Sequence, residues 1–383
     1  MFSMMREALA AMPWLILAMS PLANAACECG YSVNASTSDQ FTSYTDLMEN
    51  DFLHTVVDNI TEAGWRVQVY NVSSTVLPPQ PYGKNFTLEN VESNPLKDKY
   101  SWTGDSENGG DAGLRLWVRG DTSNGYVQSA EVASVREDIL HGSFRIGMKL
   151  SGAGATCGAF FWFHSDAQEI DMEFLSKDFT DTQSLVNLVL QTPESVAAGY
   201  DASNTSEYKK QPLYFRPDEK VHEYRYDWAP GSVKFYVDGT FVYEMTENIP
   251  VDAGHMLMNH WSNGNALWSG GPPKQDTYLT VTYVKSYFNT TNTAKNNAYK
   301  SRCANWNATQ VCEIPTQTVA PDPSGADGNT TANTYFFSLD GTDKVPGQDV
   351  YPSTNGGSSL FGSTSISIYV PVMVALFSWA FAI

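Results

Sequence analysis

The apolar residues of this chain occur in short runs that alternate with polar residues and are broken by Gly, Asn, Asp and Pro. From about residue 41 to about residue 290, the sequence lacks the 3.6-residue repeat of a long amphipathic helix. Alternation is typical of β-strands. The clearest predicted strands are Gly113–Val118, Ser143–Met148, Val221–Trp228, Val233–Val237 and Tyr278–Phe288. Since about 250 residues suffice for one large two-sheet sandwich, the pattern predicts a single all-β domain over 41–290.

One β-hairpin can be placed from the sequence. Two alternating runs, Val233–Val237 and Thr240–Val242, flank the dipeptide Asp238-Gly239. A tight turn needs positive φ angles, which Asp and Gly adopt more readily than most residues. The sequence therefore predicts two neighbouring antiparallel strands here.

The composition differs on either side of the predicted domain. Residues 26–40 form an N-terminal segment, and 291–315 form a polar extension that contains two cysteines. Residues 316–357 are rich in Pro, Ser, Thr, Gly and Asp, and they have too few large apolar side chains to offset the entropy of ordering. We therefore predict a stalk over 316–357, in which Tyr335-Phe336-Phe337 is the one cluster that could dock locally.

The N-terminus has the pattern of a secretory signal peptide. Arg6 precedes an apolar run that reaches Leu17, and Ala23-Asn24-Ala25 is typical of a cleavage site. Pro13 and Pro21 interrupt the run, which disfavours the alternative of a membrane anchor. Residues 1–25 are therefore expected to be removed from a secreted protein.

The C-terminus has the pattern of a glycosylphosphatidylinositol (GPI) attachment signal. Small residues at Asn355-Gly356-Gly357 precede a polar spacer and the uncharged run Ile366–Ile383. A plain transmembrane helix is the alternative, but no basic residue flanks the run on its far side. We expect 358–383 to be removed and the chain to be anchored to the outer face of the plasma membrane or the cell wall.

Charge and glycosylation motifs agree with an extracellular location. The formal net charge of −19 disfavours nucleic acid and anionic lipid as partners, whereas a neutral polysaccharide is indifferent to it. Asn-x-Ser/Thr sequons indicate passage through a glycosylating secretory pathway. They lie at Asn34, Asn59, Asn71, Asn85, Asn204, Asn289, Asn307 and Asn329.

Five cysteines in an oxidising compartment predict two disulfides and one unpaired thiol. Cys303 with Cys312 is the simplest pairing. One of Cys27 and Cys29 is then expected to bridge elsewhere, with Cys157 as the candidate partner.

The segment Glu169-Ile170-Asp171-Met172-Glu173 places three carboxylates at every second position within an apolar, aromatic stretch. On a strand these three side chains share one face, and Ile170 and Met172 share the other. Like charges along one strand cost stability, so this pattern is typical of a functional site. A solvated acidic face of a lectin or wall protein is the alternative interpretation.

Paired carboxyl groups about 5 Å apart are what a retaining glycosidase uses, one as nucleophile and one as acid/base. Glu169 and Glu173 can supply them, and Asp171 between them can hydrogen-bond the nucleophile. A charged Glu169 would raise the pKa of Glu173 and keep it protonated as the acid.

Aromatic side chains near the acidic segment favour a sugar-binding surface, because the C–H faces of pyranose rings are apolar. The candidates are Trp162, Phe163, Trp261 and Trp268. His164 and His260 are as easily structural as functional. The sequence has no nucleotide-binding or metal-ligand motif, so no cofactor is predicted.

These motifs together resemble glycoside hydrolase family 16, and most closely its lichenase-like β-glucanases. The resemblance rests on four stretches in matching order: 141–149, 159–175 with its E-x-D-x-E signature, 222–239 and 248–261. It implies a concanavalin A-like β-jelly-roll sandwich with a concave substrate cleft. It also implies Glu169 as nucleophile, Asp171 as assisting carboxylate and Glu173 as acid/base. The substrate contacts it suggests are Glu131, Phe161, Phe163, Asn259, Trp261 and Trp268.

The chain also departs from the family pattern. Glu131-Val132-Ala133 stands where lichenase-like members often carry E-x-R, so a sugar-binding arginine is missing. Gln183 and Asn187 are candidates for the amides that the following strand should present. Many relatives hold a structural calcium, but the aspartate expected for it is replaced near Thr282.

Our first hypothesis from the sequence is a monomeric retaining endo-β-1,3(4)-glucanase that hydrolyses cell-wall β-glucan, of a GPI-anchored fungal type. The alternatives are a wall-remodelling transglycosylase of the same family and a non-catalytic glucan-binding lectin. Hydrolysis and transfer share a covalent glycosyl-enzyme step and differ in whether water or a sugar hydroxyl resolves it.

Overall fold

The computed structural model describes residues 27–39, 42–55, 60–76, 79–323, 333–339, 345–349 and 351. The predicted signal peptide and GPI signal lie outside these residues. The described part of the chain contains no helix of the length and apolarity that crossing a membrane requires.

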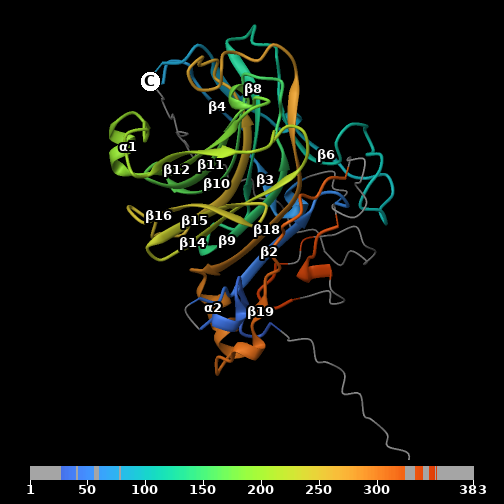
Figure 1. The fold of residues 1–383 in the computed structure, drawn as a ribbon, viewed down its shortest axis with the longest axis vertical. Helices are drawn as coiled ribbons and strands as arrows, with labels where there is room; N and C mark the ends of the chain where they lie inside the picture. Colours follow the sequence, from blue (N-terminus) through green and yellow to red (C-terminus); the bar gives the residue numbers. More distant parts are fainter. Residues whose placement is uncertain are drawn as a thin grey trace, which may run out of the picture.

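Most of the described strands belong to two large sheets that pack face to face (Figure 1). We call the nine-stranded sheet, which carries the acidic segment, the site sheet. Its order is β13-β12-β11-β10-β17-β8-β5-β4, with β3 also paired to β8. Its strands are β3 (Trp65–Val67), β4 (Tyr70–Val72), β5 (Gly83–Phe86), β8 (Tyr126–Ser134), β10 (Cys157–Ser165), β11 (Gln168–Leu175), β12 (Ser184–Gln191), β13 (Tyr208–Leu213) and β17 (His255–Trp261).

The eight-stranded sheet, here called the back sheet, has the order β16-β15-β14-β9-β18-β7-β6, with β2 paired to β18. Its strands are β2 (Asp46–Asp51), β6 (Val91–Asn94), β7 (Gly113–Val118), β9 (Ile139–Lys149), β14 (His222–Ala229), β15 (Ser232–Val237), β16 (Thr240–Met245) and β18 (Thr277–Thr290). The predicted all-β jelly-roll sandwich is thereby confirmed.

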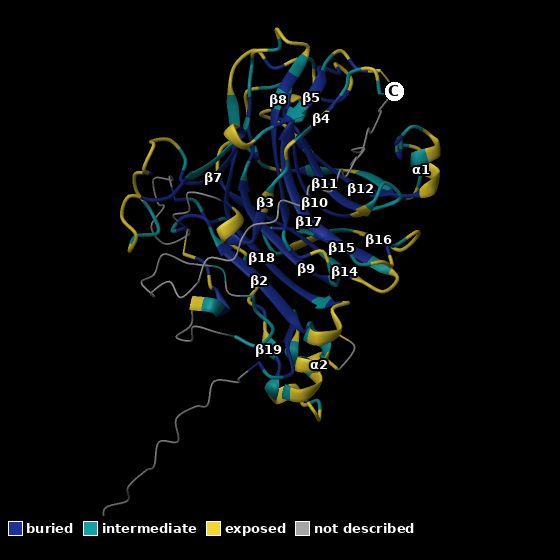
Figure 2. Cartoon of the chain, turned by 180° about the vertical axis from the view of Figure 1, so that it is seen from behind, coloured by how far each residue is buried: buried dark blue, intermediate teal, exposed yellow. Residues whose placement is uncertain are grey.

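The hydrophobic core lies between the inner faces of the two sheets. The site sheet contributes large side chains at alternate positions of β10 and β11, and the back sheet contributes matching ones from β9, β14, β15 and β18. Among them are Phe160, Trp162, Ile170, Met172, Ile146, Tyr226, Phe235 and Val284. Buried residues follow the strands, and exposed residues gather in the connections and in the helices (Figure 2). The outer face of the site sheet is thus left for function.

The predicted hairpin is confirmed. Strands β15 and β16 pair in antiparallel register, and Asp238 and Gly239 between them have φ angles of 45° and 71°. Strand β7 has the bounds expected from the sequence, β14 is shifted by one residue from its predicted run, and β9 and β18 extend theirs by one to a few residues.

The cysteine pairing predicted from the sequence is wrong. Cys27 bridges Cys312, and Cys29 bridges Cys303, each with Cα atoms 5.0 Å apart. Cys157 is the unpaired thiol. It lies on β10 of the site sheet, whereas the other four cysteines gather where the N-terminal segment meets the extension. There β1 (Tyr31–Ser32) pairs in parallel with β19 (Cys312–Glu313).

Among the described residues, two α-helices lie outside the sheets, α1 (Pro193–Ala197) and α2 (Thr293–Arg302). The second falls within the polar extension, where no helix was predicted from the sequence. The side chain of Asn292 accepts hydrogen bonds from the backbone N–H groups of Ala294 and Lys295 and so caps the helix. Helix α2 buries none of its residues. It therefore needs no apolar stripe, and the hydrophobic pattern of the sequence did not predict it.

The described parts of 316–357 pack against the back sheet and do not stand away from it as the expected stalk would. Phe336 and Phe337 are buried. The Phe337 ring lies 5.1 Å from that of Tyr31 and 5.9 Å from that of Tyr287, centroid to centroid. Glu49 accepts hydrogen bonds from the backbone N–H groups of Phe337 and Ser338. The local docking of the aromatic cluster is therefore confirmed.

Candidate active site

Strand β11 places the three carboxylates on the outer face of the site sheet. Glu169, Asp171 and Glu173 alternate with Ile170 and Met172, which belong to the core. Each of the three acids is only 1% exposed. Their cross-strand neighbours on β10 are Phe163, Phe161 and Ala159, in that order. The acidic row is therefore flanked by aromatic rings on the same face.

Some carboxylate oxygens in this row have protein partners and others do not. Asp171 donates a hydrogen bond to Glu169. The thiol of Cys157 lies 3.7 Å from Glu173 Oε1, to which it donates. Asp171 Oδ2 and Glu173 Oε2 are buried, and no group of the described residues bonds them. Unbonded buried oxygens are costly, so these two atoms point to a ligand with hydroxyl groups.

Burial raises the pKa of all three carboxyl groups well above their ordinary values. The negative charges along β11 reinforce one another, and the charge of Asp171 in particular raises the pKa of Glu173 further. The hydrogen bond from Asp171 acts in the opposite direction on Glu169 and favours its ionised form. The three carboxyl groups are therefore coupled, and their protonation is a property of the row as a whole.

Glu131 on β8 forms a second polar group on the outer face. Its Oε1 accepts from the Tyr70 hydroxyl and its Oε2 accepts from Asn259 Nδ2, each at 3.2 Å. Burial raises the pKa of Glu131 to about 8, although both hydrogen bonds lower it. Asn259 Oδ1 is buried without a partner among the described residues. Glu131 and Asn259 are thus brought together as expected from the resemblance.

Lys84 supplies a positive charge to this face and was missed by the sequence analysis. It lies on β5, its side chain is buried, and its Nζ is 4.3 Å from the centroid of the Trp261 ring. Burial lowers the pKa of Lys84 to about 8, and the charges of Glu131, Glu173 and Glu169 oppose that shift. Its ammonium group lowers the pKa of both Glu131 and Glu173 in return.

The aromatic side chains of the outer face form one cluster. Phe161, Phe163, Trp261 and Trp268 belong to it, together with Phe86 and Cys157. Trp268 Nε1 is buried without a hydrogen-bond acceptor among the described residues. An indole N–H that lacks a partner is a donor for a ligand.

Trp162 is a correction to the predicted sugar-binding set. It belongs to the core between the sheets, and its indole N–H donates to the carbonyl oxygen of Ile139. The four consecutive aromatic residues of β10 include no polar residue. The sequence therefore did not show which of them face the core and which face outward. His260 also faces inward, where its ring bonds the carbonyl oxygen of Leu116. His164 bonds the carbonyl oxygen of Ala253 at an exposed strand end, so neither histidine lies in the row.

Strand β12 presents the two amides that the family pattern calls for. Asn187 lies opposite Glu173, and Gln191 lies opposite Glu169. The Tyr208 hydroxyl donates to Asn187 Oδ1 at 2.8 Å, and Gln191 Nε2 is buried without a partner among the described residues. Gln183, the other candidate from the sequence, belongs to the connection that precedes β12. Gln191 was missed because the register between β11 and β12 was not known.

The described residues contain no group of three or more His, Cys, Asp and Glu side chains arranged to hold a metal ion. At the position where the sequence departs from the calcium-binding relatives, the Thr282 hydroxyl donates to the carbonyl oxygen of Gly147.

The chain is similar to known proteins in part of its sequence. The family model described as glycosyl hydrolases family 16 matches residues 96–285. The β-glucanases of Paenibacillus macerans and Bacillus subtilis (strain 168) are each 30% identical to this chain, over 159 and 158 residues. These alignments cover 38% of this chain and 60% and 59% of the relatives, so the chain spans about 60% of their length.

Among solved structures, a Bacillus licheniformis β-glucanase is similar at 22% identity and a TM-score of 0.47, over 63% of this chain and 98% of that chain. The family match contains all three carboxylates of β11, Glu131 of β8 and the amides of β12 and β17. Through this domain the chain belongs to glycosyl hydrolase family 16.

Proposed function

We propose that this protein is a retaining endo-β-glucanase that cleaves β-1,3 or mixed β-1,3-1,4 glucan by double displacement. The observation that carries the proposal is the row of three carboxylates on one face of β11, with buried oxygens at Asp171 and Glu173 that lack protein partners. A polysaccharide offers hydroxyl groups to such oxygens. The relatives named β-glucanase make β-glucan the substrate of first choice.

The hydrogen bonds along β11 favour one assignment of roles. Glu169 accepts a hydrogen bond from Asp171, which favours its ionised form, as a nucleophile requires. Burial and the charge of Asp171 raise the pKa of Glu173. A raised pKa keeps the group protonated, as the acid that protonates the leaving oxygen requires. Asp171 would orient Glu169 and stabilise it between the two steps.

The surrounding groups fit recognition of a neutral sugar chain. Phe161, Phe163, Trp261 and Trp268 form a buried aromatic cluster beside the row, which would pack against the pyranose rings of a bound chain. Asn259 and Glu131 are bonded to each other, and Asn259 keeps an unbonded carbonyl oxygen for a sugar hydroxyl. These residues would bind sugar units on either side of the bond that is cleaved.

The roles can be separated by exchanging each acid for its amide. On lichenan and laminarin, we expect Glu173→Gln to lower kcat by roughly 10²- to 10⁴-fold, the usual worth of a general acid. Glu169→Gln should abolish formation of the glycosyl-enzyme. The exposed residue Glu194 on α1 provides the matched control, because Glu194→Gln makes the same change of functional group at a residue that is not part of the row.

Azide distinguishes the two acids directly. With an activated aryl glucoside substrate, azide should rescue Glu173→Ala and give a β-glycosyl azide, whereas rescue of Glu169→Ala should give the α-anomer, as double displacement requires. NMR of the products reports the anomer. If both variants turn over glucan like the parent, the enzyme assignment fails and the glucan-binding lectin becomes the better interpretation.

A transglycosylase of the same family is the second candidate. Trp261 lies opposite Cys157 in the β10–β17 register, and the Cys157 thiol contacts Glu173, so an aromatic platform adjoins the proposed acid/base. An acceptor sugar stacked there would compete with water for the glycosyl-enzyme. Incubation with labelled acceptor oligosaccharides tests this, because transfer gives longer labelled products and hydrolysis gives none.

We also propose that the mature protein is secreted and anchored by GPI at the outer face of the plasma membrane or in the cell wall. The predicted signals, 1–25 and 358–383, lie outside the described residues, so the support is their sequence pattern. Two disulfides fit an oxidising compartment, and the sequon residues Asn34, Asn71 and Asn204 are exposed. Release from intact cells by a phosphatidylinositol-specific phospholipase would support the membrane anchor, release only after digestion of the wall glucan would support attachment to the wall, and retention after both treatments would contradict the proposal.

A further inference from the structure

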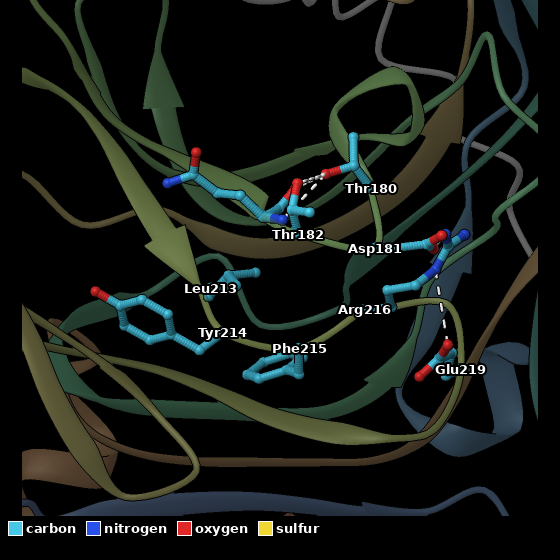
Figure 3. A pocket seen from close by; sticks show the side chains of 9 residues that line it. Thr180, Asp181, Thr182, Leu213, Tyr214, Phe215, Arg216 and Glu219 are labelled. Carbon is cyan, nitrogen blue, oxygen red and sulfur yellow. Dashed lines mark hydrogen bonds and ion pairs between the residues drawn. The ribbon is translucent and has the colours of Figure 1, made fainter.

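A pocket lies where β12 begins and β13 ends, outside the carboxylate row. Its volume is about 300 Å³, and it is lined by the connection 180–183 and by the segment that follows β13 (Figure 3). Tyr214 lies at one end of the pocket and Arg216 at the other. The Tyr214 side chain is 93% exposed, whereas its neighbour Leu213 is buried in the core.

The pocket lies at the end of strands that run beside the carboxylates. Side chains alternate along β13, so Lys210 faces outward with Asn187 whereas Leu213 faces the core, and Tyr214 follows directly after the strand. Lys210 lies opposite Asn187, which lies opposite Glu173. From Glu173, the path to Tyr214 therefore runs roughly 10 Å across two strands and about 13 Å along β13. A polysaccharide that leaves the row over β12 and β13 would pass it within a few sugar units.

The geometry points to an accessory binding subsite for a neutral polysaccharide, the β-glucan of the proposed function on which this inference rests. Tyr214 would stack against the apolar face of a sugar ring beyond the catalytic row. The hydroxyls of Thr180 and Thr182 and the amide of Gln183, which line the pocket, would bond the ring's hydroxyl groups. No chemical step takes place there.

The pocket is built on a fixed framework. Arg216 forms ion pairs at 2.8 Å with both Asp181 and Asp218 and at 3.8 Å with Glu219, so its guanidinium is oriented and carboxylates outnumber it. Phe215 stacks on the His222 ring at 3.6 Å between centroids, which anchors the segment after β13 to the back sheet. The excess of carboxylates disfavours an anionic ligand, and an aromatic side chain beside hydroxyl and amide groups suits a neutral sugar.

Binding is best measured separately from cleavage. The catalytically impaired Glu169→Gln protein serves as the parent, and retention on particulate β-1,3-glucan and on lichenan is compared with that of the parent carrying Tyr214→Ala. Loss of one aromatic stacking contact should weaken retention about fivefold. Tyr214→Trp should restore it. Tyr100→Ala is the matched control, because Tyr100 is also highly exposed, at 82%, and lies in the connection before β7.

Kinetics on the otherwise unchanged protein complete the test. We expect Tyr214→Ala to raise KM for polymeric glucan more than KM for a short oligosaccharide that spans only the row. Equal retention by Tyr214→Ala and its parent would overturn the inference, as would an equal loss on both substrates. If the parent binds glucan through Tyr214 but the unmodified chain cleaves none, the subsite stands and the proposed hydrolysis fails. If the unmodified chain cleaves glucan but Tyr214→Ala does not weaken binding, only the subsite is rejected.

Discussion

Glu173 is affected by groups from three different strands. Asp171 on the same strand raises its pKa, the Cys157 thiol on β10 lowers it through a hydrogen bond, and the Lys84 ammonium on β5 lowers it through charge. Burial acts in the same direction as Asp171 and is the largest influence. The pH at which this acid loses its proton is therefore set jointly by residues that lie far apart in the sequence.

Replacement of Lys84 tests that electrostatic balance. Its positive charge favours the ionised form of Glu173, so Lys84→Met should raise the pKa of Glu173 and move the alkaline limb of the kcat/KM profile to higher pH. Since Lys84 itself has a pKa of about 8, the difference between variant and parent should be largest below that pH. Lys84→Arg, which retains the charge, is the control. An unchanged alkaline limb in Lys84→Met would show that Lys84 has only a packing role.

Adjacent residues of β10 should respond differently to substitution because they face opposite sides of the sheet. Trp162→Ala removes a fully buried core side chain and should lower the free energy of unfolding by about 3–5 kcal/mol. Phe163→Ala should instead raise KM for glucan, because its ring borders Glu169 on the outer face. Denaturant unfolding and steady-state kinetics on both variants measure the two effects. A larger KM change in folded Trp162→Ala than in Phe163→Ala would contradict the assignment of faces.

At the scale of elements, the alternation of apolar and polar residues predicted more of the structure than the chemistry of individual side chains did. It located β7, the β15–β16 hairpin and the shared face of Glu169, Asp171 and Glu173, because each of these depends only on neighbouring residues. It could not orient β10, where Phe160 to Phe163 are all apolar. It also could not show that Lys84 and Gln191 reach the row, since their places depend on the pairing of β5 with β8 and of β12 with β11.

The disulfides join elements that the sequence separates by most of its length. Cys29 and Cys303 are 274 residues apart, and the nearest-neighbour pairing of Cys303 with Cys312 failed because β1 and β19 meet side by side. Cys303→Ser should lower the free energy of unfolding by about 2–4 kcal/mol, the usual worth of a disulfide. It should also leave Cys29 as a second free thiol. Thiol labelling followed by peptide mapping identifies the residue released, and a label on Cys312 would contradict the pairing.

At the scale of the whole molecule, the two outer faces of the sandwich have different roles. The outer face of the site sheet carries carboxylates, amides and aromatic rings with unbonded polar atoms. The outer face of the back sheet is covered in part by 333–339, where Phe336 lies over the Lys285 ammonium and Phe337 packs on Tyr31 and Tyr287. One face is thus left for a ligand, and the other is used to fasten the end of the chain.

Because these faces lie on opposite sides of the core, a substitution on one face should leave the function of the other unchanged. Phe337→Ala should lower the free energy of unfolding by about 3 kcal/mol, the lower end for removal of a buried phenyl ring, and should speed proteolysis near 333–339. The kcat and KM for glucan should stay within twofold of the parent at temperatures where the variant is folded, since no group of the carboxylate row touches this ring. Leu339→Ala is the control, because Leu339 is 44% exposed in the same segment. A selective loss of kcat in folded Phe337→Ala would mean that the fastening of the C-terminal segment is coupled through the core to the row on β11.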